Sequence, residues 1–434
     1  MNITNKLFLE RTREYFNKDS DLYLQLLNQK ATSGFFINEK KAQKEEVFNL
    51  IDFEYSSCKF NPYAYYHNDE NIGKTKAYEL GLIYPQDVES SLPASFVNPR
   101  GVKLAIDLCA APGGKSIDVL NKLDDDCLLI SNDVSYKRAS ILASNLERLG
   151  LTNTMVTSIQ PELFVKKFEN CFDLVVLDAP CSGEGMIRKY PEILDTYSLS
   201  NIKNIACTQA DLLETAYSLL KGKGQLLYST CTYAFEEDEN QIINFLSKHQ
   251  DMKIVPIDIE NNYSKLKGTI KLSPLNDCEG QFMCLMIKEG DSASRFKYKK
   301  TVKNNIVERF VKDNLAIENY FLYSKQEKYY LSFVEVPSIE NQLLNYGIYL
   351  GELKKDRFEP SHSLYRSNQL IGKFKHVVDI DDNQYNDFVL GKELKVNVSD
   401  NYYLVTYHSH SLGYGKCAKG VLKNKYPKGL RRMV

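Results

Sequence analysis

The stretch IDLCAAPGGKS, Ile106 to Ser116, decides how the region around it folds. An apolar run ends in it, small residues and two glycines follow, and a stretch with helical spacing begins after them. Such a strand-to-helix turn lets the backbone approach a ligand closely and presents the free N–H groups of a helix N-terminus. The turn fits neither GxGxxG nor GxxxxGK[ST], which disfavours a dinucleotide site and a nucleotide-triphosphate site. A plain tight turn stays open as an alternative.

Around this turn, short apolar runs alternate with amphipathic stretches from Lys103 to about Lys248. The expected buried strands are VKLAIDL, CLLISND, NTMVTS, FDLVVLD and GQLLYST. The expected helices are SYKRASILASNLERLG and IKNIACTQADLLETAYSLLKG, the second ending at Gly222. Strands alternating with helices predict an α/β fold with a parallel, doubly wound sheet. The run QFMCLMIK is expected to add an antiparallel edge strand.

Length and composition set the outer bounds of the interpretation. A chain of 434 residues is expected to form two or three domains, and its 43% hydrophobic and 26% charged residues are typical of globular proteins. The sequence has no apolar run of membrane-spanning length and no secretory signal pattern at its start. Ten irregularly spaced cysteines then indicate reduced thiols and a cytoplasmic protein. Few histidines and no CxxC pair argue against a metal site.

Shifts in composition predict the domain boundaries. Residues 1–98 form a mixed N-terminal part, residues 99–290 the α/β core, and residues 291–305 a linker. The linker lies in GDSASRFKYKKTVKNN, which is polar, basic and poor in large apolar residues. Residues 306–434 are rich in aromatic residues and predict a smaller, largely β module. The last 34 residues carry seven Lys or Arg and no acidic residue, a local basic face that suits a phosphate partner.

Three side chains with useful chemistry follow the expected strands. Asp133 ends CLLISND, where a carboxylate can accept hydrogen bonds from ribose hydroxyls, so the turn and Asp133 together fit an adenosine-containing cofactor. Cys181 stands in DAPCSGEG after the fourth strand, close behind Asp178, and Cys231 stands in YSTCTY after the fifth. Ligands of open α/β sheets bind at this rim. A cysteine there is ordinarily a small buried hydrophobe, but two at matching strand ends point to chemistry.

Two thiols beside a carboxylate suit one reaction in particular. Carbon 5 of a pyrimidine is a poor nucleophile, and a thiolate added at carbon 6 turns the ring into an enamine-like nucleophile that accepts an electrophilic methyl group. The proton at carbon 5 must then leave and the thiol must be eliminated, which a second thiol can assist. An acid near nitrogen 3 would stabilise the charge that develops on addition.

These residues carry a resemblance to a known family. DLCAAPGGKS, LDAPCSGEGMIRK and YSTCTYAFEEDEN closely resemble the signature motifs of Sun-type RNA cytosine-5 methyltransferases. GIYLGELKKDRFEPSHSL (347–364) and LGYGKCAKGVLKNKYPKGLRR (412–432) resemble the tail modules of the RsmF-like ribosomal branch, and GLIYPQDVESSLPA (81–94) resembles the segment before its core. The resemblance implies a Rossmann-like class I methyltransferase sheet, an N-terminal α/β extension that positions RNA, and a smaller PUA-like RNA-binding C-terminal domain.

The resemblance also implies cofactor, substrate and roles. It implies S-adenosyl-L-methionine as methyl donor and a cytosine in ribosomal RNA, of the small subunit, as acceptor. Cys231 would attack carbon 6, Cys181 would assist product release, and Asp178 would contact the cytosine ring near the sulfonium. The cofactor site would comprise Cys109, Ala110, Ala111, Pro112, Gly113, Gly114, Lys115, Asp133, Gln160 and Asp178.

RNA must be gripped while the target base is unpaired or flipped out. The side chains expected to contact RNA are Arg188, Lys189, Tyr414, Lys416, Lys423, Lys425, Tyr426, Lys428 and Arg431. We expect tyrosines 414 and 426 to stack on bases and residues 188 and 189 to hold the phosphate of the flipped nucleotide, or to be ordinary surface charge.

The sequence departs from the family pattern in a few places. A position near the adenine falls on Gln160 or Ser158, neither of which is a carboxylate. A usual Pro-His pair is Pro274-Leu275, Cys278 precedes Glu279-Gly280, and a usual Gly-Trp-Gly is Gly413-Tyr414-Gly415.

Other readings stay open. The core motifs fit transfer RNA as well as ribosomal RNA, and only the tail favours ribosomal RNA or a ribosomal subunit as partner. A non-catalytic RNA-binding or assembly factor would be expected to lack Cys231 or the glycine turn. A dehydrogenase would need a dinucleotide fingerprint, and a cysteine hydrolase would need a histidine partner that the core pattern does not supply. We expect a monomer.

Overall fold

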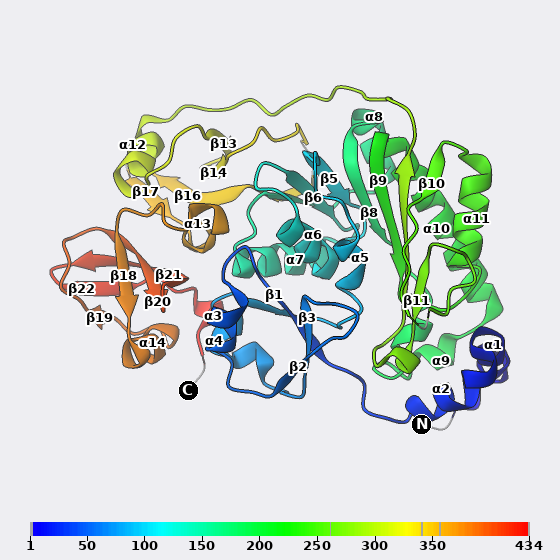
Figure 1. Cartoon of the computed structure of the whole chain (residues 1–434). Helices are drawn as coiled ribbons and strands as arrows, with labels where there is room; N and C mark the ends of the chain where they lie inside the picture. The colour runs from blue at the N-terminus through cyan, green and yellow to red at the C-terminus, as the bar shows by residue number, and fades with distance from the viewer. Residues whose placement is uncertain (1–2, 261, 340–341, 356, 433–434) are drawn as a thin grey trace.

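A mixed sheet forms the centre of the molecule. The computed structural model describes residues 3–260, 262–339, 342–355 and 357–432. The strands of this central sheet are β5 (Leu104–Asp107), β6 (Leu128–Asn132), β7 (Thr154–Thr157), β8 (Phe172–Asp178), β9 (Leu220–Thr230), β10 (Met252–Ile254), β11 (Ile270–Leu272), β12 (Gln281–Lys288) and β15 (Leu343–Tyr346). Their order is β10-β12-β9-β8-β5-β6-β7-β15, with β11 paired to β12 (Figure 1).

The strands β5 to β9 are parallel, which confirms the predicted Rossmann-like sheet. β5 pairs with β6 on one side and with β8 on the other, so the direction of winding reverses between β5 and β8. The loops that follow these two strands therefore diverge and leave a crevice at their carboxyl ends. Ligands of doubly wound sheets bind in this crevice.

Helices cover both faces of the sheet. The helices on one face are α5 (Leu92–Ser95), α6 (Gly114–Lys122) and α7 (Tyr136–Leu149), and those on the other are α8 (Glu162–Phe168), α10 (Leu199–Leu219) and α11 (Glu239–Lys248) (Figure 1). In α7, Ser135 caps the N-terminus by accepting from the N–H of Arg138, and left-handed Gly150 ends the helix. Within the described residues, no helix combines the length and apolar character that a membrane span needs.

The end of one helix and the position of one strand in the sheet differ from the sequence-based expectation. α10 ends at Leu219 rather than at Gly222, because Leu220 already pairs with Phe172 in the sheet. Gly222 instead lies inside β9, where its N–H donates to the carbonyl of Ser292. β12 is antiparallel to β9 as predicted, but it is not an edge strand, since β10 and β11 pair with its other side.

The N-terminal part adds a small antiparallel sheet. Its elements are α1 (Lys6–Phe16), α2 (Ser20–Leu26), β1 (Gly34–Ile37), α3 (Lys44–Phe48), β2 (Tyr55–Ser57), β3 (Ala64–His67), α4 (Lys76–Glu79) and β4 (Ile83–Pro85). The strand order is β2-β3-β1-β4. The segment after β4 continues along α6, where the side chain of Gln86 donates to Asp118 over 2.8 Å. This connection brings residues 86–91 beside the glycine turn.

The C-terminal part contains two sheets, whereas the sequence suggested one module. One sheet has the order β13-β14-β16-β17 and the other β18-β20-β21-β22-β19. The elements are α12 (Asn305–Asn314), β13 (Phe321–Lys325), β14 (Lys328–Ser332), β16 (Ile348–Lys354), β17 (Arg357–Pro360), α13 (His362–Arg366), β18 (Val377–Ile380), α14 (Asp382–Val389), β19 (Leu394–Lys395), β20 (Tyr402–Tyr407), β21 (His410–Ala418) and β22 (Val421–Asn424). Strand β15 leaves this part and pairs with β7, which extends the central sheet.

Candidate active site

Two cysteine side chains meet at the carboxyl rim of the central sheet. Cys181 follows β8 and Cys231 follows β9, two parallel neighbours in which Asp178 pairs with Ser229. The two Sγ atoms lie 3.0 Å apart, and the N–H of Cys231 donates to the sulfur of Cys181 over 3.3 Å. The hydrogen bond to Cys231, together with burial, raises the pKa of Cys181 well above its usual range. The structure thus brings together the two thiols that the sequence singled out.

A buried glutamate ties the two thiol loops to each other. Glu237, in the loop of Cys231, accepts from the N–H of Ser182 over 2.9 Å and from the side chain of Gln209 over 3.0 Å. The same Gln209 amide donates to the carbonyl of Pro180 over 2.8 Å. Burial raises the pKa of Glu237 to about 7. These contacts fix Pro180 and Ser182, the residues on both sides of Cys181, against the loop that carries Cys231.

A second set of contacts explains the glycines that follow Cys181. The Glu184 carboxylate accepts from the Thr232 hydroxyl over 3.1 Å and from the N–H of Tyr233 over 3.0 Å. The N–H of Gly185 donates to the carbonyl of Cys231 over 2.9 Å. A Cβ atom on Gly185 would lie 2.4 Å from the Cα of Gly280, so only glycine fits here.

An ion pair lies beside the thiols. Asp178 pairs through Oδ2 with the ammonium of Lys115 at 3.0 Å and accepts from the hydroxyl of Ser229 through Oδ1 over 2.7 Å. Lys115 also donates to the hydroxyl of Ser90 over 3.2 Å. Burial alone would lower the pKa of Lys115, but Asp178 outweighs it and the pKa is raised. A buried ammonium and a one-third exposed carboxylate therefore stand together at the rim.

The glycine turn lies at the crevice between β5 and β8. Gly113 has a φ of 126°, in the left-handed region, and no side chain caps the first N–H groups of α6. Ala110 and Ala111 are buried, and Cys109 is half-buried with its pKa raised by burial. The turn therefore presents backbone rather than side chains to a ligand.

Three carboxylates end or follow neighbouring strands beside this turn. Asp107 ends β5, Asp133 follows β6 and Asp178 ends β8. Burial and the nearby Asp178 raise the pKa of Asp107 to about 7, and its Oδ1 is buried without a partner among the described residues. These three carboxyl groups suit a ligand that carries a positive charge and ribose hydroxyls, because carboxylates attract the charge and accept hydrogen bonds from the hydroxyls. Among the described residues, no group of three or more His, Cys, Asp or Glu side chains is arranged to hold a metal ion.

The residues near the expected adenine lie beyond β7. Gln160 is exposed, and its carbonyl accepts from the N–H of Leu163 at the start of α8. Ser158 is buried, and its hydroxyl donates to the carbonyl of Val134 over 3.2 Å. The adenine contact of Gln160 stays a prediction.

The structure corrects the role expected for Arg188. Its guanidinium is 5% exposed and forms an ion pair at 2.7 Å with Glu279, which is fully buried. It also donates to the carbonyl of Cys278 over 2.8 Å. Arg188 therefore joins two loops beneath the site and has no free face for a phosphate. Lys189 pairs with Asp87 at the edge of the site, so its phosphate contact stays a prediction.

The tyrosines expected to stack on RNA are buried as well. The ring of Tyr414 stacks on Tyr365 with centroids 4.5 Å apart, and its hydroxyl donates to the carbonyl of Pro360 over 2.7 Å. Tyr426 is 4% exposed and packs against Phe388. These rings are core residues, and the stacking expectation is wrong for both.

The basic residues of the tail remain at the surface. Lys416, Lys423, Lys425 and Lys428 are exposed, and Arg431 is half-buried against the carbonyl of Tyr426. Their contacts with RNA stay predictions.

The sequence analysis missed several residues that organise the site. Ser90 and Asp87 lie in PQDVESS, a segment that the resemblance included without assigning roles. Glu237 stands in the acidic run EEDE after Cys231, which was a usable signal. Lys271 carries no local signal, because it reaches the site from a short strand 40 residues further along the chain.

The strand order, the glycine turn at the winding reversal and the rim carboxylates define a Rossmann-like methyltransferase. Comparison with known families identifies the family of methyltransferases. Residues 94–287 match the family model of 16S rRNA methyltransferase RsmB/F, and residues 5–88 match the N-terminal domain of 16S rRNA methyltransferase RsmF. Residues 308–367 match the RsmF rRNA methyltransferase first C-terminal domain, and residues 375–432 match the methyltransferase RsmF PUA domain. The chain belongs to the RsmB/F family and has the domain set of its RsmF branch.

Individual relatives agree with this placement. The chain is 28% identical over 387 residues to ribosomal RNA small subunit methyltransferase F of Vibrio vulnificus, covering 83% of this chain and 81% of that protein. It is 34% identical over 246 residues to tRNA (cytosine(49)-C(5))-methyltransferase of Pyrococcus abyssi, covering 56% of this chain and 75% of the relative. The crystal structure of NSun6 from Pyrococcus horikoshii with SFG shares the fold, with a TM-score of 0.60 and 19% identity over 66% of this chain and 98% of that one.

Family membership confirms three of the sequence-based expectations. The chain is an RNA methyltransferase, its methyl donor is S-adenosyl-L-methionine, and its C-terminal domain is PUA-like. The roles of individual side chains do not follow from family membership.

Proposed function

We propose that this enzyme methylates carbon 5 of a cytosine in small-subunit ribosomal RNA through a covalent adduct with Cys231. The observation that carries the proposal is the pair of rim thiols 3.0 Å apart, with Asp178 and Lys115 beside them. A single thiol would suffice for a hydrolase or a structural role. Adding to a pyrimidine and releasing it again gives two thiols separate tasks.

The residues of the crevice fit the methyl donor. The uncapped N-terminus of α6 and the backbone of residues 109–115 would hold the methionine part, and Asp133 would bind the ribose hydroxyls. The carboxylates of Asp107 and Asp178 would face the positive charge of the sulfonium. When bound, S-adenosylmethionine would supply an electrophilic methyl group to carbon 5 and leave as a neutral thioether, which keeps the electron pair of the broken sulfur–methyl bond. Gln160 would lie at the adenine end.

Cys231 would start the reaction as a thiolate. The ammonium of Lys115 is close enough to Cys231 for the charges of the two groups to interact. The sulfur forms a bond to carbon 6 of cytosine, and the electron pair of the ring double bond becomes available at carbon 5. Asp178, held by Lys115 and Ser229, would act as the proton partner of nitrogen 3. It would pass a proton from the Lys115 ammonium to that nitrogen, which neutralises the negative charge that develops on the ring.

Cys181 would complete the reaction. Its pKa is raised chiefly by the hydrogen bond to Cys231, so it stays protonated while Cys231 is free. Once Cys231 is bonded to carbon, that interaction is lost and Cys181 becomes more acidic. Cys181 can then lose its own proton to water and, as a thiolate, take up the proton from carbon 5. The electrons of the C–H bond restore the ring double bond, and the bond from carbon 6 to Cys231 breaks.

The choice of RNA rests on the parts outside the core. The N-terminal domain and both C-terminal domains match the RsmF branch, which favours ribosomal RNA or a ribosomal subunit. The exposed lysines of β21 and β22 would hold its phosphates. Transfer RNA is a second candidate, because the tRNA methyltransferase of Pyrococcus abyssi is 34% identical over the 246 residues that match this chain. We further propose that the enzyme acts in the cytoplasm as a single chain.

The proposal is tested with wild type, Cys181→Ala and Cys231→Ala, incubated with the methyl donor and ribosomal RNA from cells lacking the enzyme. A denaturing gel detects the covalent adduct, and sequencing maps 5-methylcytosine. We expect methylation by wild type and a shifted band for Cys181→Ala alone. A band for Cys231→Ala instead would reverse the thiol roles. Methylation of transfer RNA but not of ribosomal RNA would establish the second candidate, and no adduct or methylation on either would refute the proposal.

A further inference from the structure

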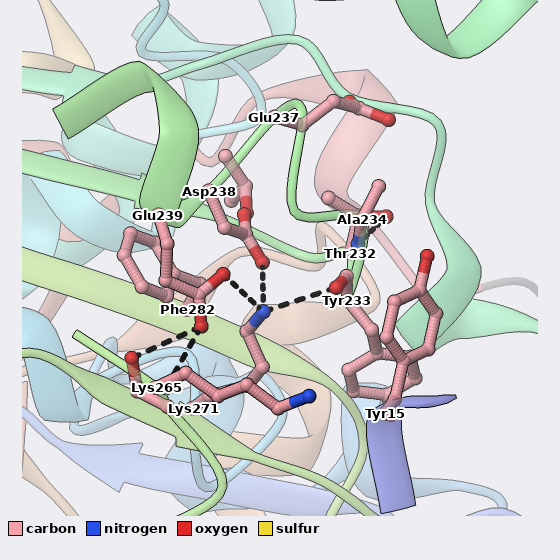
Figure 2. Close-up of polar contacts among 12 residues, drawn as sticks. Tyr15, Thr232, Tyr233, Ala234, Glu237, Asp238, Glu239, Lys265, Lys271 and Phe282 are labelled. Atoms are coloured by element: carbon pink, nitrogen blue, oxygen red, sulfur yellow. Dashed lines mark hydrogen bonds and ion pairs between the residues drawn. The ribbon is translucent and has the colours of Figure 1, made fainter. Parts of the chain in front are cut away.

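A buried lysine holds the loop that carries Cys231. Lys271 lies in β11, outside the five parallel strands, and its side chain is 2% exposed. Its ammonium forms an ion pair with Asp238 at 3.0 Å, donates to Glu239 over 2.7 Å and donates to the carbonyl of Tyr233 over 3.0 Å. Figure 2 shows these three contacts converging on the one nitrogen atom. Tyr233 and Asp238 lie in the loop that begins at Cys231, and Glu239 is the first residue of α11, where that loop ends.

The contacts reach both sides of Cys231. Lys271 pairs in register with Phe282, and Phe282 pairs with Thr230, so the three residues form one row across β11, β12 and β9. The Thr230 hydroxyl donates to Oδ1 of Asp238 over 2.6 Å, while Oδ2 of Asp238 faces Lys271. The ammonium therefore fixes Thr230, directly before Cys231, through Asp238. It fixes Tyr233, two residues after Cys231, directly.

One buried ammonium meets two buried carboxyl groups at this position, and burial raises the pKa of Asp238 well above its usual range. Asp238 is fully buried and Glu239 is 3% exposed. Burial alone would lower the pKa of Lys271, but these two carboxylates outweigh it and the pKa is raised. Removing one partner of such a cluster leaves uncompensated charge, whereas neutralising all of it is tolerated far better. The cluster can thus be varied in ways that separate stability from geometry.

We propose that Lys271 is a positioning residue for the methyl-transfer reaction: it sets the place of the Cys231 sulfur by fixing the backbone on both sides of it. This inference rests on the proposed role of Cys231 as nucleophile. A displacement of about 1 Å in a reacting group can cost on the order of 10²-fold in rate. Loss of the contacts therefore lowers the rate of adduct formation and leaves cofactor and RNA binding in place.

The experiment compares Lys271→Met with a matched control, Lys265→Met. Lys265 lies in the same region and is drawn in Figure 2, but it is exposed and its ammonium donates to the carbonyl of Glu14. A third protein combines Lys271→Met with Asp238→Asn and Glu239→Gln, so that no buried charge stays unpaired. A fourth, Thr230→Val, keeps all charges and shape and removes only the link to Asp238.

Two quantities are measured at saturating methyl donor and RNA: the single-turnover rate, and the adduct yield against time in a Cys181→Ala background. Dissociation constants for both ligands are measured separately. We expect the rate to fall about 100-fold for Lys271→Met and its neutralised form, roughly 10-fold for Thr230→Val, and not at all for Lys265→Met. Both dissociation constants should stay within about 2-fold of wild type.

The outcomes are decisive in each case. A wild-type rate in the folded neutralised form or in Thr230→Val overturns the positioning role. If Lys271→Met does not fold, those two variants still decide. If a variant's rate returns to the wild-type value when the concentration of methyl donor or RNA is raised, the defect lies in binding. That result also overturns the positioning role. Methyl transfer by Cys231→Ala would instead refute the proposed function itself.

Discussion

Two of the buried cations in the described part of the chain, Lys271 and Arg366, have partners of different kinds. Near the thiols, Lys271 meets the carboxylates of Asp238 and Glu239, so charge is neutralised on the spot. At the junction of the N-terminal part, the core and the last domain, Arg366 is 2% exposed and meets carbonyl groups. Its guanidinium donates to the carbonyls of Glu79, Arg148, Ser411 and Leu412.

The difference indicates two functions of a buried cation: joining distant segments of the fold and fixing a loop beside reacting groups. Burial lowers the pKa of Arg366 to about 10, a sign that nothing nearby offsets its desolvation fully. Its carbonyl partners come from α4, α7 and β21, so the guanidinium joins segments hundreds of residues apart. Lys271 fixes a single loop beside reacting groups. We therefore expect changes at the thiol rim to lower the rate per folded molecule, whatever they do to stability. Changes at the junction should lower stability at a constant rate per folded molecule.

Asp178→Asn should give the largest effect and sharpen this contrast. The amide keeps the shape but loses the charge that pairs with Lys115 and that would meet the ring and the sulfonium. We expect the single-turnover methylation rate per folded molecule to fall about 10³-fold. The free energy of unfolding should also fall, because the buried ammonium of Lys115 loses its anionic partner. Rate and urea denaturation are measured on the same preparation. Asp195→Asn, at an exposed carboxylate in α9 (Ile193–Thr196), is the control. A rate close to wild type would remove Asp178 from the mechanism.

Arg366→Met should show the reverse pattern. Four buried carbonyls lose their donor, and we expect a loss of about 4 kcal/mol in the free energy of unfolding. The rate per folded molecule should stay within about 3-fold of wild type, because no partner of Arg366 lies at the rim. Arg357→Met removes an exposed arginine of β17 and serves as the control. If Arg366→Met were stable but slow, the junction would be part of the active site and the comparison would fail.

The two regions also differ in how far the sequence could predict them. The thiols, Asp178 and the glycine turn lie in contiguous motifs at strand ends, and a parallel sheet brings strand ends together, so their meeting could be expected. Arg366 and Lys271 act through partners that only the tertiary fold assembles. Tyr414 and Tyr426 were misread because an aromatic residue in a basic segment looks the same whether its ring faces RNA or the core.

Glu237 gives a smaller, pH-dependent test at the rim. Its pKa is about 7 in the folded protein against an ordinary value of 4.5, so between these pH values the folded state keeps a proton that the unfolded chain has lost. Stability must then fall as pH rises through this window. At about 1.4 kcal/mol per pH unit, the loss reaches about 3 kcal/mol.

The measurement is the free energy of unfolding from urea titrations at pH 5, 6, 7 and 8. Glu237→Gln keeps an acceptor for Ser182 and should flatten the fall. The pKa of Asp107 is raised as well, so part of the fall in unfolding free energy with pH should remain in Glu237→Gln. Glu236→Gln is the control, because the hydrogen bond from Arg11 outweighs burial and lowers the pKa of Glu236. An unchanged slope in Glu237→Gln would show that Glu237 is ionised in the folded enzyme.

The smallest effect on stability is expected at the surface, where the charged side chains are not buried. Lys416 and Lys423 are exposed and lie directly opposite each other on β21 and β22. Like charges in such a pair repel, so Lys423→Ala should stabilise the free protein by roughly 0.3 kcal/mol. If the pair binds phosphate, the same change should weaken RNA binding a few-fold and reduce the slope of log affinity against log salt by about 1. Filter binding at several salt concentrations and urea titration measure the two quantities. Opposite signs for stability and binding would mark this strand pair as an RNA contact, and an unchanged salt slope would exclude it.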